Sequence, residues 1–285
     1  MSLYYGVITI ATLMFSLQFL FNQQFEKQCG SGPRSTLVFF SGYSAAGLLV
    51  LLIINGFRFE FSSFSLIMAI LTALNGLAYT VCSLKAFGKI NLSLYSVFSM
   101  LGGMMLPFFF GIFFFDEKFT GGKLLCIALV AASLLLTIRR GAKNSGLWYY
   151  GGIFLLNGLA GVLSKIFEAA PFEKTSAAGY SVLSAMAAVF LSFILLPFVK
   201  GEKVRLNFRA AGTMLGYGVL NKVGNFLLLI ALAHLPASVQ YPMVTGGTMI
   251  FSTILCCITP EKPSGRDIAA VTLSFIGILA LVLIP

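Results

Sequence analysis

The sequence predicts an all-α membrane protein with ten transmembrane helices, arranged as two inverted five-helix repeats. Three observations predict this fold class: an apolar composition, ten apolar runs of spanning length, and an internal repeat. Hydrophobic residues make up 58% of the 285 residues, and charged residues only 10%. Soluble domains average about 45–50% apolar and about 25% charged residues. This composition excludes soluble globular, disordered and nucleic-acid-binding proteins, despite a net charge of +10.

Ten apolar runs are separated by charged or turn-forming residues, and each run is long enough to cross a bilayer. A hydrocarbon core of about 30 Å requires about 20 residues of α-helix. The runs are continuous rather than alternating, which excludes a β-barrel. The first run has no basic segment before it and is too long for a signal peptide, so we expect it to be retained as a helix. In order, the predicted helices cover residues 3–21, 36–55, 64–86, 92–115, 122–138, 147–167, 176–198, 210–232, 237–258 and 268–284.

An internal repeat divides these helices into two groups of five. Residues 1–140 and 146–285 form the two predicted repeats, which a short basic segment joins. Shifting the chain by 144 residues brings matching residues of the two halves together: Gly102-Gly103 with Gly246-Gly247, Met105 with Met249, Glu117-Lys118 with Glu261-Lys262, Gly121 with Gly265, and Tyr5 with Tyr149.

The odd number of helices in each repeat predicts how the protein works. A second copy of five spans must enter the membrane from the opposite side, which produces an inverted pair. Such a pair has two packings that are related by exchanging the conformations of its halves, around a site near the middle of the membrane. We therefore expect a carrier that works by alternating access rather than a receptor or an anchor.

One stretch of the first half resembles a known family. Pro107 is followed ten residues later by Glu117-Lys118-Phe119-Thr120 and then by the small apolar helix 122–138. This resembles the closing signature of the EamA unit in the drug/metabolite transporter superfamily, and the second half repeats it more weakly at Thr259-Pro260-Glu261-Lys262. The counterpart of Pro107 is Phe251. The resemblance implies a secondary carrier of small metabolites, often an exporter of amino acids, in a cytoplasmic membrane.

Lys222 is the main candidate for substrate binding. It lies near the middle of the eighth predicted helix, about 18–20 Å from either end at about 1.5 Å per residue. A lysine stem reaches only part of that distance, so we expect its ammonium group to face the protein interior or a water-filled cavity. Asn225 shares this helix face and Asn221 adjoins it. Such a site suits a carboxylate or a phosphate, and the alternative is a structural lysine bonded to backbone carbonyls.

None of the nine acidic residues lies in the middle of a predicted helix. Carriers of cationic drugs typically use a buried carboxylate that exchanges a proton for substrate. We therefore expect neutral, zwitterionic or anionic cargo. The single histidine, His234, lies near a helix end, where an interfacial role is the simpler interpretation. Lys85 and Lys165 lie in terminal turns, and we expect both to reach the membrane interface.

Other polar side chains could line the transport path, although each could equally bond neighbouring helices together. Asn75 and Tyr79 share one face of the third helix, and Gln18 lies late in the first. The complete predicted substrate site comprises Lys222, Asn221, Asn225, Asn75, Tyr79, Tyr95, Ser99, Tyr241, Thr245 and Asn157.

The leading hypothesis is a secondary transporter for a small metabolite. Alternatives are a flippase for a lipid-linked sugar and, from a different class, an intramembrane enzyme. The sequence has a single histidine and no HExxH or GxSxG string, so we expect no catalytic residues, metal or cofactor. Expected partners are the small-molecule substrate and membrane lipids, without nucleic acid, and we expect a functional monomer. Loop charges favour termini outside the cell, whereas the resemblance implies termini inside, so orientation stays open.

Overall fold

The computed structural model describes residues 2–30, 32–87, 92–136, 147–201, 204, 206–258 and 264–284. Within these ranges the chain forms ten α-helices and no strand. The helices are α1 Ser2–Cys29, α2 Pro33–Ile54, α3 Ser63–Phe87, α4 Leu92–Phe114, α5 Gly121–Leu136, α6 Leu147–Ala169, α7 Ala177–Leu195, α8 Phe208–Leu232, α9 Ala237–Ile258 and α10 Gly265–Leu283. All ten runs predicted to be helical coincide with these helices. The largest difference is in α1, which continues well beyond its predicted end at residue 21.

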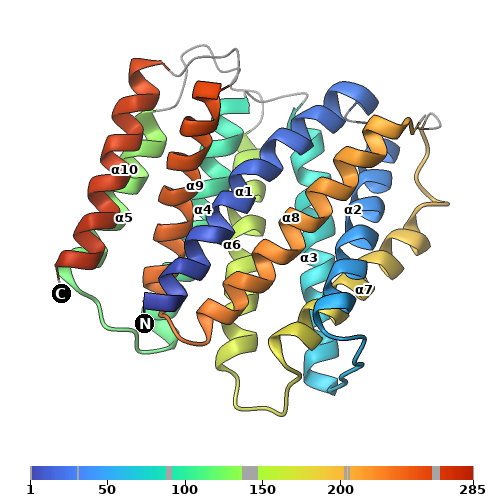
Figure 1. Ribbon diagram of the computed structural model, residues 1–285, viewed down its shortest axis with the longest axis horizontal. Coiled ribbons are helices and arrows are strands. Elements are labelled where there is room, and N and C mark those ends of the chain that lie inside the picture. Colours follow the sequence, from blue (N-terminus) through green and yellow to red (C-terminus); the bar gives the residue numbers. More distant parts are fainter. Residues whose placement is uncertain are drawn as a thin grey trace.

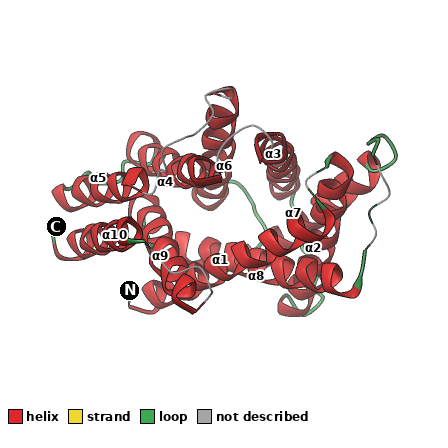
Figure 2. Ribbon diagram, turned by 90° about the horizontal axis from the view of Figure 1, so that it is seen from above, coloured by secondary structure: helices red, strands yellow, loops and turns green. Residues whose placement is uncertain are grey.

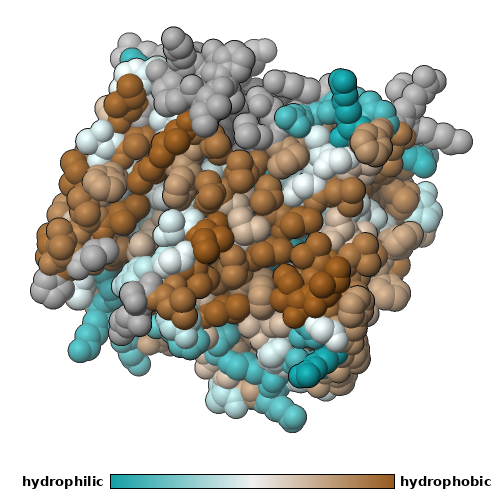
Figure 3. Space-filling view, viewed as in Figure 1, coloured by the Kyte–Doolittle hydropathy of each residue, from teal (hydrophilic) through white to brown (hydrophobic). Residues whose placement is uncertain are grey.

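Five helices, namely α2, α3, α6, α7 and α8, contain segments long and apolar enough to cross a membrane. Large hydrophobic side chains on the outside of the bundle are exposed, and Phe190 and Phe193 of α7 are 66% and 65% accessible. Soluble monomers rarely expose apolar patches larger than a few hundred Å². Figure 3 shows hydrophobic side chains across the middle of one face, with hydrophilic ones gathered along the lower edge and at the upper right. These features indicate a membrane protein.

Local sequence signals explain where several helices begin and end. Gly30 adopts a positive φ of 70° after α1, a conformation that glycine tolerates best, and Pro33 begins α2. Ser176 caps α7 by accepting a hydrogen bond from the Gly179 backbone NH at 3.1 Å. Asn207 caps α8 in the same way through the backbone NH of Ala210. These caps satisfy backbone donors that the helix itself leaves unpaired.

Many contacts between helices of one half have a matching contact in the other half. Helices of equal rank pack on each other, as α5 on α10, α4 on α9 and α2 on α7. The other principal contacts come in reciprocal pairs: α1–α8 with α6–α3, α4–α6 with α9–α1, and α2–α8 with α7–α3. Exchanging the halves leaves these contacts unchanged, whereas the α9–α10 contact is more extensive than its counterpart α4–α5. Figure 2 shows α5 and α10 side by side at one end of the bundle and α2 and α7 near the other.

The pair α5–α10 is antiparallel and closely packed. A Cβ atom added to Gly122, near the start of α5, would lie 2.2 Å from the backbone oxygen of Ile284, just beyond α10. Further along the pair, the hydroxyls of Ser133 and Ser274 hydrogen-bond at 2.7 Å. Figure 1 shows α1 beginning and α10 ending at the lower edge, whereas α6 begins at the opposite edge. We call this lower edge, where α1 begins and α10 ends, the termini face.

Two buried clusters form much of the core. One joins α4, α5, α9 and α10 and includes Met104, Phe108 and Val130. The other joins α3, α6, α7 and α8 and includes Phe167 and Leu229. Both clusters draw on helices from both halves, so the halves share their hydrophobic cores.

Candidate functional site

Lys222 lies on α8 where that helix crosses α2, and it is half-buried. Its stem passes directly over Gly47, because a Cβ atom at that position would lie 2.2 Å from the Lys222 Cγ. The crossing is close because Gly218 also lacks a side chain, and a Cβ there would lie 2.4 Å from the Tyr43 backbone oxygen. The Lys222 Nζ lies 5.9 Å from the centre of the Tyr43 ring. The two glycines therefore let α2 hold the lysine stem.

The Lys222 ammonium has no acidic partner among the residues that the structure describes. The ion pair found in these ranges joins Lys165 to Glu117, and Lys222 takes no part in it. A ring face at 5.9 Å attracts a cation but leaves its hydrogen-bonding capacity free. Lys222 can therefore donate hydrogen bonds to an anionic group that reaches it.

The face of α8 that carries Lys222 points toward the rest of the bundle. Leu229 lies seven residues further along, on the same helix face, and is buried in the cluster with Leu163, Phe167 and residues of α3 and α7. Asn225 is exposed and donates to the Asn221 backbone oxygen at 2.7 Å. The expectation that the lysine faces the interior agrees with this packing.

Asn221 contacts α1 rather than the Lys222 ammonium. Its side chain donates to the Gln18 side chain at 3.1 Å. Nearby, a Cβ on Gly224 would lie 3.1 Å from the Phe15 ring. Asn221 therefore bonds α8 to α1, which is the helix-bonding role left open by the sequence.

Four of the predicted site residues form a polar network between α3, α4 and α6. The hydroxyls of Tyr79 and Ser99 lie 2.7 Å apart. Asn157 donates to the Ser99 backbone oxygen at 2.7 Å, and Asn75 donates to the Leu156 backbone oxygen at 2.9 Å. The structure therefore brings these four residues into contacts among three helices, and their place on a transport path stays a prediction.

One atom of this network is left without a partner within the described part of the chain. The side-chain oxygen of Asn75 is buried and accepts no hydrogen bond. Buried polar atoms in native proteins are usually paired, so an unpaired oxygen beside Tyr79 and Ser99 marks a position where a ligand donor or a water could bind.

Tyr43 connects the network to Lys222. Its ring faces the ammonium group, and its hydroxyl interacts with Thr80 of α3, close to Tyr79. Its ring also packs edge-on against Tyr217 at 4.9 Å between centroids. A continuous set of polar and aromatic groups thus runs from α8 through α2 to α3, α4 and α6. Tyr43 was missed in the sequence because nothing there distinguishes it from other tyrosines in apolar runs.

The remaining predicted residues lie apart from this set or cannot be placed. The Tyr241 hydroxyl donates to the Gly161 backbone oxygen at 2.9 Å, in a buried contact between α9 and α6. Thr245 is buried one turn further along α9. The side chain of Tyr95 and that of Lys85 lie outside the part of the chain whose side chains are described.

Lys165, which we expected to reach the membrane interface, forms an ion pair with a loop acid. Its ammonium lies 2.8 Å from the Glu117 carboxylate, and the two side chains are only 12% and 7% exposed. The same ammonium lies 5.3 Å from the centre of the Phe115 ring. The sequence did not predict this pair, because it forms only where Glu117 folds back from the α4–α5 loop over the end of α6, which is a tertiary contact.

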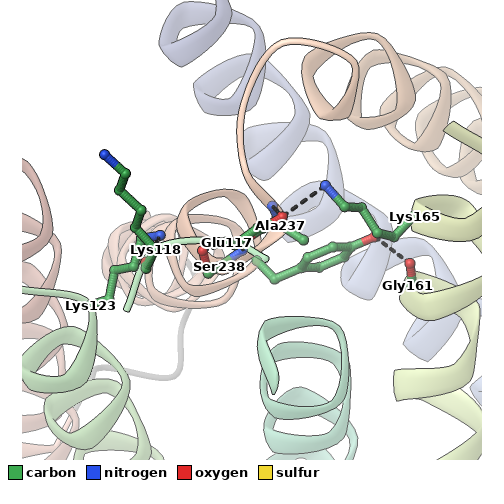
Figure 4. A network of polar contacts seen from close by, with 8 residues as sticks. Glu117, Lys118, Lys123, Gly161, Lys165, Ala237 and Ser238 are labelled. Atoms are coloured by element: carbon green, nitrogen blue, oxygen red, sulfur yellow. Dashed lines mark hydrogen bonds and ion pairs between the residues drawn. The ribbon is translucent and has the colours of Figure 1, made fainter. Parts of the chain in front are cut away.

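Glu117 also caps the start of α9. Its oxygens accept hydrogen bonds from the backbone NH groups of Ala237 and Ser238, at 2.8 and 2.9 Å, and from the Ser238 hydroxyl at 2.5 Å. Figure 4 shows the carboxylate between the α9 start and Lys165. Negative groups are favoured at helix N-termini by the unpaired backbone donors and the helix dipole. The carboxylate is therefore saturated with donors.

These contacts set the ionisation of Glu117. Burial by itself would raise its pKa, but the hydrogen bonds from Lys165, Ser238 and Ala237 outweigh burial and hold the pKa below its ordinary value of 4.5. The group is therefore ionised at neutral pH, where the network is complete.

The ranges that the structure describes contain no group of three or more His, Cys, Asp or Glu residues that could hold a metal ion. His234 instead stacks on Tyr4 at 3.9 Å between ring centroids. This contact joins the start of α1 to the α8–α9 turn, which fits a role at a helix end.

Comparison with models of protein families finds none that matches, and comparison with curated proteins finds no match either. Among solved structures, 29 chains match this one. One of them, described as a crystal structure of a protein, aligns over 99% of this chain and 97% of its own length, with a TM-score of 0.79 and 15% identity. At this identity the likeness concerns the fold alone. The same arrangement of helices therefore occurs in a chain of very different sequence.

Proposed function

We propose that the protein is a secondary transporter that moves a small metabolite across the cytoplasmic membrane by alternating access, with export as its direction. The cargo is an amino acid or another zwitterionic or anionic compound. The observation that carries the proposal is the reciprocal packing of the two halves of the chain around a half-buried lysine that has no acidic partner among the described residues.

Reciprocal packing supports a pair of inverted repeats, residues 1–140 and 146–285, whose ten helices all cross the membrane. Each principal contact of one half has a counterpart in the other, and α1 and α6 begin at opposite edges of the bundle (Figure 1). Halves related in this way can exchange their conformations, so that a central site opens to each side in turn.

Lys222 and the Asn75 network support the class of cargo. The lysine offers donors to an anionic group, and the unpaired oxygen of Asn75 offers an acceptor. A zwitterion needs both kinds of partner. A phosphate would use the lysine alone, because phosphate oxygens are acceptors.

The proposal is tested by comparing metabolites in the medium of cells that overexpress the protein with those of cells that lack it. We expect overexpression to raise the external level of one or a few zwitterionic or anionic compounds. Lys222→Met keeps the length of the stem and removes the charge. Loss of one charged hydrogen bond costs about 1.5–3 kcal/mol, so we expect the apparent affinity for that compound to fall by about tenfold or more.

Lys174→Met is the matched control for this experiment. Lys174 donates to the backbone oxygens of Phe167 and Glu168, so its charge supports the end of α6 rather than the candidate site. We expect this variant to export the same compound. A Lys222→Met variant that inserts and exports like the native chain would exclude the anion-binding role. Identical media from overexpressing and deletion cells would argue against export.

A further inference from the structure

The ion pair between Glu117 and Lys165 has no role in substrate binding as proposed above, yet both of its side chains are largely shielded from solvent. The carboxylate is 7% exposed and has four donors around it: Lys165, the backbone NH groups of Ala237 and Ser238, and the Ser238 hydroxyl. Each of the two carboxylate oxygens therefore accepts from two donors.

This carboxylate and its partners come from three separate elements on the termini face. Glu117 itself belongs to the loop between α4 and α5, Lys165 to the end of α6, and Ala237 to the first turn of α9. Lys123 of α5 also approaches the carboxylate, although its ammonium donates to the Lys118 backbone oxygen. One side chain thus ties together the ends of the helices that meet at this face.

The helices directly inside this contact are also joined. Gly161 of α6 lies against Pro107 of α4 and the Tyr241 ring of α9, because an added Cβ would come within 2.4 Å and 2.9 Å of them. The Tyr241 hydroxyl donates to the Gly161 backbone oxygen. If α4 or α9 moved away from α6 at this face, the ion pair and these contacts would separate together.

The position that matches Lys165 in the first half carries no cation in the sequence. A shift of 144 residues places Lys165 on Phe21, and Phe21 packs against Gly216 of α8. Glu261, the counterpart of Glu117, lies outside the described residues. The sequence therefore provides a charged partner for closing one face and an apolar residue at the matching position of the other.

We infer that Glu117, Lys165 and the first turn of α9 form a latch that keeps the termini face closed in the resting state. This inference rests on the proposed alternating-access function. Opening toward the termini face requires the carboxylate to leave both the ammonium group and the α9 backbone donors. The latch thus biases the resting protein toward exposing its central site to the opposite face.

The test measures access to the inner side of the latch. Ser164 lies on α6 on the same helix face as Gly161 and Asn157, so Ser164→Cys places a thiol there. A membrane-impermeant maleimide is applied separately to each side of vesicles, and the termini face is identified by a tag after residue 285. Labelling is quantified residue by residue with mass spectrometry, which separates this thiol from native cysteines.

We expect Glu117→Gln and Lys165→Met each to raise labelling from the termini face by about tenfold or more, a shift of about 1.4 kcal/mol in the opening equilibrium. The double variant should not exceed Glu117→Gln, because that substitution already removes the charge with which Lys165 pairs. Lys165→Met leaves the α9 cap intact, so it reports on the latch even if Glu117→Gln fails to fold.

Glu60→Gln is the matched control. Glu60 accepts hydrogen bonds from the Ser176 backbone NH and hydroxyl at the start of α7 on the same face, without an ion pair in the described chain. We expect native labelling from this variant. Folded single variants that label like the native chain would overturn the latch, whether or not transport persists. Raised labelling together with no exported compound in any variant would instead overturn the transport function and leave the latch standing.

Discussion

The α4–α6 crossing and its counterpart, the α9–α1 crossing, occupy matching places in the two halves but differ in how closely their backbones approach. A Cβ on Gly102 would lie 2.0 Å from the Phe154 backbone oxygen, and one on Gly158 would lie 2.6 Å from the Gly102 backbone oxygen. At the α9–α1 crossing, a Cβ on Gly247 would lie 3.2 Å from the Thr12 side chain. At the α4–α6 crossing the two helix backbones contact each other directly. At the α9–α1 crossing the α9 backbone contacts a side chain of α1.

The sequence accounts for the difference. Gly158 falls on Met14 under the shift of 144 residues, and a methionine there excludes the backbone approach that small residues allow. Equal topology therefore does not give equal packing. If the halves exchange conformations during transport, the two end states are not copies of each other, and the α4–α6 side makes the closer contact.

The largest effect should come from the same substitution at the two matching glycines. Gly102→Ala forces a methyl group against a backbone oxygen, and overpacking of this kind costs about 1–3 kcal/mol, occasionally more. Gly246→Ala meets the flexible end of Ile278 at 3.0 Å, so we expect a loss of stability below about 1 kcal/mol. Thermal unfolding in detergent measures both variants. Equal losses would show that the two matching glycines are packed equally tightly.

A second difference between the halves is the ion pair, and its pH dependence should be measurable. The pKa of Glu117 is lower in the folded chain than its ordinary value of 4.5. The carboxylate therefore stabilises the fold fully above about pH 4.5, and this stabilisation is lost as the pH falls through the lower, folded pKa. We expect the melting temperature to fall in that acidic range, and to fall less steeply in Glu117→Gln. Equal slopes for the two proteins would contradict the assignment.

The smallest effect concerns the polar network, in which Asn157 of the second half has an apolar residue as its counterpart in the first half. Asn157 falls on Leu13 under the same shift. Asn157→Leu removes the hydrogen bond to the Ser99 backbone oxygen, and hydrogen bonds between membrane helices average about 0.6 kcal/mol. We expect a loss of that size in thermal unfolding. Leu13→Asn serves as the reverse control and should give no gain, because α1 offers no matching geometry at its 39%-exposed position.

The sequence predicted the positions of the helices because each helix is an apolar run closed by charged or turn-forming residues. It also singled out Lys222, since a charge far from both ends of a helix is costly without a purpose. It also named Asn75, Tyr79, Ser99 and Asn157 as candidates to line the path, but it did not predict the hydrogen bonds that these residues make.

The sequence did not reveal which atoms meet. Glu117 appears in it as an ordinary loop acid and Lys165 as an ordinary terminal lysine, and their contact depends on how the α4–α5 loop folds over α6. Gly47 gives no signal either, because its role exists only where α2 crosses the Lys222 stem. Both features are tertiary, and residue spacing along one helix cannot encode them.

The shared cluster around Val130 bears on the order of events during synthesis. Met104, Phe108 and Val130 are made long before Met249 and Ala270, yet all five residues bury one another. Until α9 and α10 are made, the surface of α4 and α5 that carries Met104, Phe108 and Val130 must therefore contact the translocation machinery or lipid instead. Contacts so distant in sequence form late, so the first half reaches its final compactness only after the last helix has emerged from the ribosome.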